Sequence, residues 1–255
     1  MPRTVALGDH QLNRIGLGTN RLTDSAESCS FLQAAVAAGL NFIDTAHLYA
    51  GGESETAIGR ALASHSDDVV IATKGGYHSG GGTPGLRAEV EQSFERLRVD
   101  TIALYYLHRV DPDVPIEETM GLLREYREAG RIAHVGLSEV TVEQIERARS
   151  VVPIAAVQNE YNLSERRYDV VDYCTSEGIV FVPFYPLHGD GPPALTEIAA
   201  RFDATLSQIR LAWLLHRSPL IAPIPGTLSI EHLRENLAAL DIELTAEDFE
   251  WLRAG

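Results

Sequence analysis

The chain has 255 residues, of which 45% are hydrophobic, and this composition suits a globular protein with one large domain or two small ones. A formal net charge of −15 at pH 7 repels nucleic acid and anionic membrane surfaces, so neither is expected as a partner. Two cysteines far apart in the sequence, without any paired Cys/His spacing, disfavour a disulfide framework and a structural zinc site.

The chain begins with "MPRTVALGDHQLN", which lacks the apolar core of a secretory signal. No uninterrupted apolar stretch approaches the roughly 18 residues that a membrane-spanning helix needs. The low cysteine content fits a reducing compartment. We therefore expect a cytoplasmic protein.

Short apolar segments recur along the whole chain. The first of them, "TVALGDHQLN", is interpreted as a hairpin that turns at Gly8 and Asp9. The eight segments that follow are rich in β-branched or aromatic residues and mostly continuous, as strands buried on both faces are. These predicted strands cover residues 14–18, 41–44, 69–74, 102–108, 132–138, 154–158, 179–184 and 220–225.

Amphipathic segments with helical spacing lie between these strands. Gly39 is a predicted helix C-cap, and "LSEVTVEQ" and "TLSIEHL" place Ser or Thr ahead of acidic residues, as helix starts do. The glycine-rich segment 75–85 lacks the Gly-Lys-Ser/Thr of a phosphate loop and is interpreted as a mobile connection. The predicted helices cover residues 27–39, 53–64, 86–97, 116–129, 142–150, 165–177 and 230–239.

The strict alternation of strands and helices predicts parallel strands with right-handed crossovers. Eight such units close into a (β/α)8 TIM barrel, here with a short N-terminal β-hairpin and residues 1–255 as one domain. A doubly wound open sheet is the alternative, but no G-x-G-x-x-G turn follows the first strand.

In a TIM barrel the chemistry lies at the carboxyl ends of the strands. Asp44, Lys74 and His108 each end a predicted strand, and Tyr49 follows Asp44 by five residues. A carboxylate compensates the burial of a lysine, and the ammonium favours the phenolate of a nearby tyrosine, which predicts a lowered tyrosine pKa. With a histidine to orient a carbonyl, this group would deliver a proton to a developing oxyanion.

A proton donor alone reduces nothing, so the hydride would come from a cofactor. Ser138 and Gln158, at two further strand ends, are placed to hydrogen-bond a carboxamide, and Phe184 is placed to stack on a flat ring. The helix that begins after "IPGT" would attract a phosphate at its N-terminus. The loop histidines are further candidates for contact with substrate or cofactor, namely His47, His78 and His188.

Structural roles remain open for each residue taken alone, since strand-end ion pairs and packed aromatic rings are common. A zinc site formed by Asp44, His47 and His108, as in a metal-dependent barrel hydrolase, is a further alternative. However, no H-x-H ends a strand, and Lys74 would bring a cation close to the metal. No metal site is therefore expected.

Several of these segments resemble the aldo-keto reductase family. "GLNFIDTAHLYAGGESETAIGRAL" resembles the family signature around its aspartate and tyrosine, "VVIATK" its lysine strand, and "DTIALYYLHRVDP" its histidine strand. "GRIAHVGLSEV", "VQNEYNL" and "IPGTLSIEHLREN" resemble its cofactor-binding segments. Together these segments run from about residue 14 to residue 240.

The resemblance implies an NAD(P)H-dependent reductase that converts an aldehyde or ketone to an alcohol. Tyr49 would be the proton donor, Lys74 would tune it, Asp44 would hold Lys74, and His108 would orient the carbonyl. The cofactor contacts implied by the family are Gly18, Thr19, Asn20, Asp44, Ser138, Glu139, Gln158, Phe184, Tyr185, Pro186, Leu187, Gly189, Ile224, Gly226, Thr227, His232, Glu235 and Asn236.

The sequence departs from the family pattern at the nucleotide end. Glu139 stands where many members have Asn, and Gly226 and His232 stand where the best-known members carry Lys and Arg for the 2′-phosphate. Thr227, His232 and Arg234 are expected to serve instead, with NADPH preferred over NADH. A weaker resemblance to bacterial pyridoxal reductase-like members suggests an aromatic aldehyde, and we expect a monomer or weak oligomer. The non-enzymatic alternative is an NADP(H)-sensing regulatory module.

Overall fold

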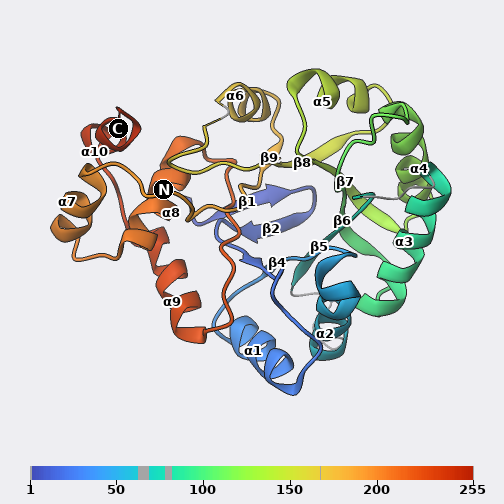
Figure 1. The fold of residues 1–255 in the computed structure, drawn as a ribbon, viewed down its shortest axis with the longest axis horizontal. Coiled ribbons are helices and arrows are strands. Elements are labelled where there is room, and N and C mark those ends of the chain that lie inside the picture. Colours follow the sequence, from blue (N-terminus) through green and yellow to red (C-terminus); the bar gives the residue numbers. More distant parts are fainter. Residues whose placement is uncertain (1, 63–68, 78–81, 167, 255) are drawn as a thin grey trace.

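The computed structural model describes residues 2–62, 69–77, 82–166 and 168–254. In Figure 1 the parallel strands surround the centre of the molecule and the helices lie outside them. The parallel sheet of the described residues has strands that follow one another in sequence order, namely β3 (Leu17–Gly18), β4 (Phe42–Asp44), β5 (Val70–Gly75), β6 (Ile102–Leu107), β7 (Ile132–Ser138), β8 (Ile154–Gln158) and β9 (Val180–Phe181).

The segment of residues 220–226 closes this sheet, although it is not a regular strand. On one side Phe181 N donates to Leu220 O at 2.9 Å, and on the other Gly18 N donates to Pro225 O at 3.3 Å. Pro223 and Pro225 have no N–H to donate, so a continuous ladder cannot form here. The predicted (β/α)8 fold is confirmed, but the prediction of a regular eighth strand over 220–225 is wrong.

Every predicted helix is present in the outer layer of the described residues, with differences at the helix ends, and three further α-helices there were not predicted. The α-helices of this layer are α1 (Ala26–Ala37), α2 (Glu53–Leu62), α3 (Gly82–Leu97), α4 (Ile116–Glu128), α5 (Val142–Arg149), α6 (Tyr168–Ser176), α7 (Ala194–Arg201), α8 (Leu206–Arg217), α9 (Ile230–Ala238) and α10 (Ala246–Ala254), with short 3-10 helices η1 (Tyr49–Gly52) and η2 (Ala239–Asp241). Thr141 and Ser229 cap α5 and α9 as predicted, and Gly39 follows α1 with a φ of 94°.

Two expectations about the helices need correction. The prediction had no helix at α7, α8 or α10. Helix α8 was missed because its residues 209–215 are all buried and, apart from Arg210, apolar, so they show no amphipathic pattern. The interpretation of 75–85 as a connection is wrong at both ends, because Gly75 belongs to β5 and Gly82 begins α3. Residues 78–81, with the candidate His78, and residues 63–64 of a predicted helix lie outside the described residues.

The predicted N-terminal hairpin is present and closes one end of the barrel. Strands β1 (Thr4–Leu7) and β2 (His10–Asn13) pair antiparallel, and Figure 1 shows them at the centre of the ring. The side chains of Val5, Leu7 and Leu12 pack into the barrel interior with apolar residues of the parallel strands. Because Asn13 N donates to Asn41 Oδ1, just before β4, the hairpin covers the amino ends of the strands and leaves the carboxyl ends open.

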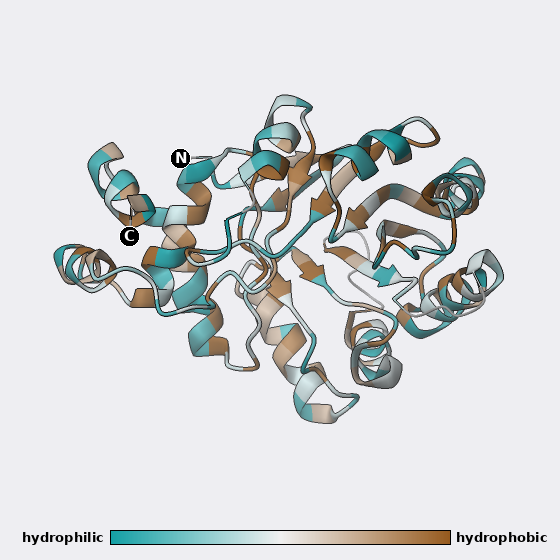
Figure 2. Ribbon diagram, turned by 45° about the horizontal axis from the view of Figure 1, so that its top comes forward, coloured by the Kyte–Doolittle hydropathy of each residue, from teal (hydrophilic) through white to brown (hydrophobic). Residues whose placement is uncertain are grey.

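A second apolar layer lies between the sheet and the helices. Figure 2 shows the strands mostly in brown, while teal segments lie mainly on the surrounding helices and loops. This is the layering expected for parallel strands buried on both faces. Among the helices of the described part of the chain, none combines the length and apolar character that a membrane crossing requires.

Candidate active site

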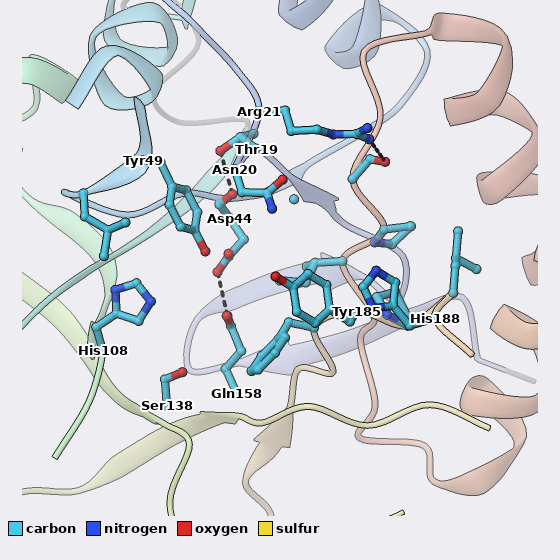
Figure 3. A pocket seen from close by; sticks show the side chains of 18 of the residues that line it. Thr19, Asn20, Arg21, Asp44, Tyr49, His108, Ser138, Gln158, Tyr185 and His188 are labelled. Carbon is cyan, nitrogen blue, oxygen red and sulfur yellow. Dashed lines mark hydrogen bonds between the residues drawn. The ribbon is translucent and has the colours of Figure 1, made fainter. Parts of the chain in front are cut away.

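A cavity of about 640 Å³ opens at the carboxyl ends of the strands. Figure 3 shows side chains from distant parts of the sequence converging on it. Among the residues expected at the site, those that line the cavity are Gly18, Thr19, Asn20, Asp44, Tyr49, His108, Ser138, Gln158, Phe184, Tyr185, Pro186, Leu187, Ile224 and Gly226.

The register of β4 and β5 brings Lys74 next to Asp44, which lines the cavity. Asp44 pairs with Ala72, and Lys74 lies two residues further along β5 on the same face of the sheet. Lys74 Nζ lies 2.5 Å from Asp44 Oδ1 and 2.6 Å from the carbonyl oxygen of Thr45. Both side chains are buried, so they form an ion pair shielded from solvent.

Tyr49 is carried over this ion pair by the turn that follows β4. The turn is fixed to the next strand because His47 N donates to Lys74 O at 2.9 Å. Gly51 and Gly52 then adopt left-handed backbone angles, which glycine allows without steric cost. Tyr49 Oη ends 3.5 Å from Lys74 Nζ and faces the cavity.

His108 reaches the same place from the end of β6. Its backbone N–H donates to Gly75 O at 2.7 Å, which continues the β5–β6 pairing by one residue. The imidazole packs edge to face on two tyrosine rings, with its centre 6.1 Å from the ring centre of Tyr49 and 4.9 Å from that of Tyr77. The structure therefore brings the four predicted catalytic side chains to one place.

Burial shifts the pKa of each of these groups, and nearby charges add to that shift or oppose it. Burial raises the pKa of Tyr49 above its ordinary value and outweighs the opposing effect of the Lys74 ammonium. The prediction that the pKa of Tyr49 falls is therefore wrong in its net direction, since only the contribution of Lys74 has the expected sign. Burial lowers the pKa of Lys74, but Asp44 and Tyr49 together raise it by more.

The pKa of His108 falls to about 2, because burial and the positive charges of Lys74 and Arg109 all oppose protonation. At neutral pH the site thus holds a protonated phenol, an ammonium and a neutral imidazole.

The other half of the cavity has the groups expected for a flat polar ligand. Ser138 and Gln158 are register partners on β7 and β8, so their side chains enter the cavity side by side. Gln158 Nε2 also donates to Asp44 Oδ2 at 2.7 Å, which links this half to the ion pair. Phe184 and Tyr185 follow β9, and the ring of Tyr185 stacks on His188 at 4.2 Å (Figure 3).

Some predicted cofactor residues do not line the cavity. The carboxylate of Glu139 accepts a bond from Glu160 N at 2.7 Å, and Gly189 packs so closely on Ser164 that a Cβ would lie 1.9 Å from its hydroxyl. The remaining ones lie at the start of α9 and along it, namely Thr227, His232, Glu235 and Asn236. Thr227 accepts a bond from Ser229 N at 3.0 Å, and Glu235 accepts one from Thr205 Oγ1 at 2.6 Å.

The cavity wall also contains residues that the prediction did not assign to the site, namely Arg21, Leu48, Tyr77, Arg109 and Pro225. His188, one of the candidate loop histidines, joins them, whereas His47 Nε2 lies 2.9 Å from Gln92 Oε1. Arg109 directly follows His108 at the end of a predicted strand, and this position could have identified it as a residue of the site.

Within the described residues, no three His, Cys, Asp or Glu side chains lie close enough together to hold a metal ion. Asp44 instead contacts Lys74 and Gln158. The ligand set considered for a barrel hydrolase is therefore not assembled among these residues.

Comparison with known proteins identifies the family. The model of the Aldo/keto reductase family matches residues 14–192 and 190–254. The chain belongs to the aldo/keto reductase family. Its class as an NAD(P)H-dependent oxidoreductase is thereby confirmed.

Individual members of the family match over nearly the whole chain. Pyridoxine 4-dehydrogenase of Escherichia coli is 36% identical, over 96% of this chain and 95% of its own. A thermostable aldo-keto reductase crystallised with the inhibitor epalrestat has a TM-score of 0.91 at 32% identity, covering 98% of both chains. An aldo/keto reductase from Klebsiella pneumoniae in complex with NADP and acetate has a TM-score of 0.87 at 29% identity, covering 100% of this chain and 95% of that one.

Proposed function

We propose that this aldo/keto reductase reduces an aldehyde or ketone to an alcohol with NADPH, and that Tyr49 is the proton donor. The observation that carries the proposal is the position of the Tyr49 phenol, which faces the cavity 3.5 Å from the buried Lys74 ammonium. Burial keeps this phenol protonated near neutral pH, as a proton donor must be.

Each of the four residues has a separate part in this proton transfer. Tyr49 gives its proton to the carbonyl oxygen, and the Lys74 ammonium stabilises the phenolate that is left. Asp44 holds Lys74 in place through the buried ion pair. Neutral His108, whose ring contacts that of Tyr49, orients the carbonyl by donating a hydrogen bond.

NADP(H) fits the other half of the cavity, and when bound it supplies the hydride. Ser138 and Gln158 would hold its carboxamide, and Phe184 would lie against the nicotinamide ring. Gly18 and Gly226, which have no side chains, leave room for close approach of the cofactor to the backbone. The family neighbour with NADP bound supports this cofactor. Arg234 and His232, both exposed on α9, are our candidates for the 2′-phosphate.

The substrate class suggested by the cavity is a planar aromatic aldehyde. Leu48, Tyr49 and Tyr77 give the wall beside His108 an apolar and aromatic character. The relation to pyridoxine 4-dehydrogenase makes pyridoxal a natural first substrate to test.

The test is oxidation of NADPH, followed at 340 nm, with purified protein and 4-nitrobenzaldehyde or pyridoxal. NADH is run in parallel at the same concentration. Steady turnover with NADPH and a several-fold lower kcat/KM with NADH are expected. Tight NADPH binding without turnover of any aldehyde would favour the sensing module instead, and a clear preference for NADH would remove the assignment of the 2′-phosphate site.

A further inference from the structure

The charges that line the cavity differ in sign from the charge of the protein as a whole. The chain carries a net charge of −15, yet the charged side chains of the cavity wall are Arg21, Arg109 and Asp44. Asp44 is paired with Lys74, which leaves the wall formed by the described residues positive. A positive cavity in an acidic protein attracts small anions while the rest of the surface repels them.

The two arginines lie at different parts of this wall. Arg21 Nη2 donates to Gly226 O at 3.0 Å, which places it beside the segment that leads to α9 (Figure 3). Arg109 Nη1 donates to His108 O at 2.7 Å and to Ser138 Oγ at 3.2 Å. Arg109 therefore lies between Ser138 and the His108 side of the cavity, where the carbonyl would be reduced, whereas Arg21 borders the end that would take the nucleotide.

The Arg109 guanidinium is held in place by more than these two bonds. It lies 5.1 Å from the centre of the Tyr77 ring, and that ring lies 4.9 Å from the His108 ring. Stacking on an aromatic face restrains the orientation of the planar guanidinium. Arg109 is thus connected to Tyr49 through the rings of Tyr77 and His108.

Arg109 has no carboxylate to neutralise it in the described part of the chain. None of the ion pairs within 4.0 Å there includes Arg109, although many other arginines of the protein have an acidic partner. The residues after Tyr77 that lie outside the described ranges are His, Ser, Gly and Gly, so they contain no acid. A guanidinium has five N–H donors, and both hydrogen bonds of Arg109 come from the one nitrogen, Nη1.

We propose that Arg109 binds an anionic group of the carbonyl substrate, so that the enzyme prefers aldehydes or ketones that carry a carboxylate or a phosphate. This inference rests on the proposed function, because it assigns the other end of the molecule whose carbonyl meets Tyr49. A carboxylate and a phosphate share the chemistry that matters, namely two oxygens that accept parallel bonds from a planar guanidinium.

The test uses aldehydes of similar shape and different charge. The kcat/KM with NADPH is measured for 4-carboxybenzaldehyde, 4-formylphenyl phosphate and neutral 4-nitrobenzaldehyde. Nitro and carboxylate groups are alike in size but differ in their effect on carbonyl reactivity. The informative quantity is therefore the ratio of the anionic to the neutral kcat/KM, compared between wild type and variants.

Arg109→Gln should lower this ratio about 10- to 100-fold, the loss expected for a charge-assisted hydrogen bond. In Arg109→Lys the ratio should lie between those of Arg109→Gln and the wild type, because lysine keeps the positive charge but not the two parallel N–H donors of the guanidinium. Arg21→Gln is the matched control and should leave the ratio unchanged, whatever it does to the KM for NADPH. The anion whose ratio falls most in Arg109→Gln identifies which of the two groups the site takes.

If Arg109→Gln lowers all three kcat/KM values equally, Arg109 acts through Ser138 and not on the substrate anion, and the inference is wrong. Failure of the wild type to reduce even 4-nitrobenzaldehyde would instead refute the proposed function. Calorimetric binding of 4-(hydroxymethyl)benzoate to the protein with NADP+ decides the inference in that case. Binding at least tenfold weaker in Arg109→Gln would support the anion site, and equal or absent binding would overturn it.

Discussion

Replacing Asp44 by Asn tests the buried ion pair, because it removes one charge with almost no change in size. Lys74 is completely buried, and Asp44 is its one anionic partner among the described residues. In Asp44→Asn the ammonium would keep only neutral partners, among them the Thr45 carbonyl at 2.6 Å, the Tyr49 hydroxyl at 3.5 Å and the amide oxygen of the substituted side chain. Removal of one partner of a buried ion pair costs about 3–5 kcal/mol.

This loss is a large part of the roughly 5–15 kcal/mol that stabilises a typical native protein. For a chain of this length it corresponds to a decrease in Tm of about 6–20 °C. The assay is urea and thermal unfolding of the protein without cofactor, followed by circular dichroism. Both measurements should report the same loss.

The double variant Asp44→Asn with Lys74→Met is the control, because it removes both charges. Replacement of a complete buried ion pair by neutral groups is often close to neutral, so the double variant should recover most of the lost stability. If Asp44→Asn alone cost less than about 1 kcal/mol, or if the double variant were the less stable of the two, the ion pair would not have the role assigned to it.

The remaining predictions concern protonation and backbone packing. Because the pKa of His108 is lowered from 6.5 to about 2, the unfolded chain binds one more proton than the folded chain between these two pH values. His108 therefore destabilises the protein by about 1.4 kcal/mol for each unit by which the pH is lowered below about 6.5. His108→Asn should remove that slope between pH 6.5 and 5, and identical slopes in urea titrations would contradict the pKa of His108. Lys74 lowers the pKa of Tyr49, so the alkaline limb of kcat/KM should move to higher pH in Lys74→Met, and a shift to lower pH would count against this pairing. Gly18→Ala places a Cβ 2.7 Å from Ile224 O at the barrel seam, where β3 meets the segment of residues 220–226, and should lower the free energy of unfolding by about 1–3 kcal/mol. Gly121→Ala, in helix α4, meets nothing within 4 Å and should raise the free energy of unfolding by about 0.5–1 kcal/mol. Equal effects of these two glycine variants in urea unfolding would exclude the close approach at the seam.

The order of strands and helices could be predicted because the continuous apolar runs of buried strands differ from the helical spacing of apolar residues in amphipathic helices. The strand ends were predicted well enough to place Asp44, Lys74 and His108 at one opening, since parallel strands end on the same side. The prediction of a regular eighth strand was wrong because it rested on the apolar character of residues 220–225. It did not take into account that Pro223 and Pro225 have no N–H group.

Other features depend on contacts that a sequence does not contain. The net direction of the Tyr49 pKa depends on how deeply the phenol is buried, and the sequence showed only that a lysine would be near. Arg109 belongs to the cavity wall because β6 and β7 bring it within 3.2 Å of Ser138, 29 residues away. Residues 209–215 of α8 have no exposed polar face because other helices cover α8 on its outer side, including α7, α9 and α10.

The central claim is that the Tyr49 phenol, held beside the Lys74 ammonium, protonates the substrate. Tyr49→Phe removes one oxygen atom and leaves the ring that packs against His108. The most direct measurement pairs the rate of NADPH oxidation with the Kd for NADPH, obtained from cofactor fluorescence. We expect the rate to fall at least about 100-fold while the Kd changes less than about threefold. A variant that keeps the wild-type rate would contradict the assignment of Tyr49 as the proton donor.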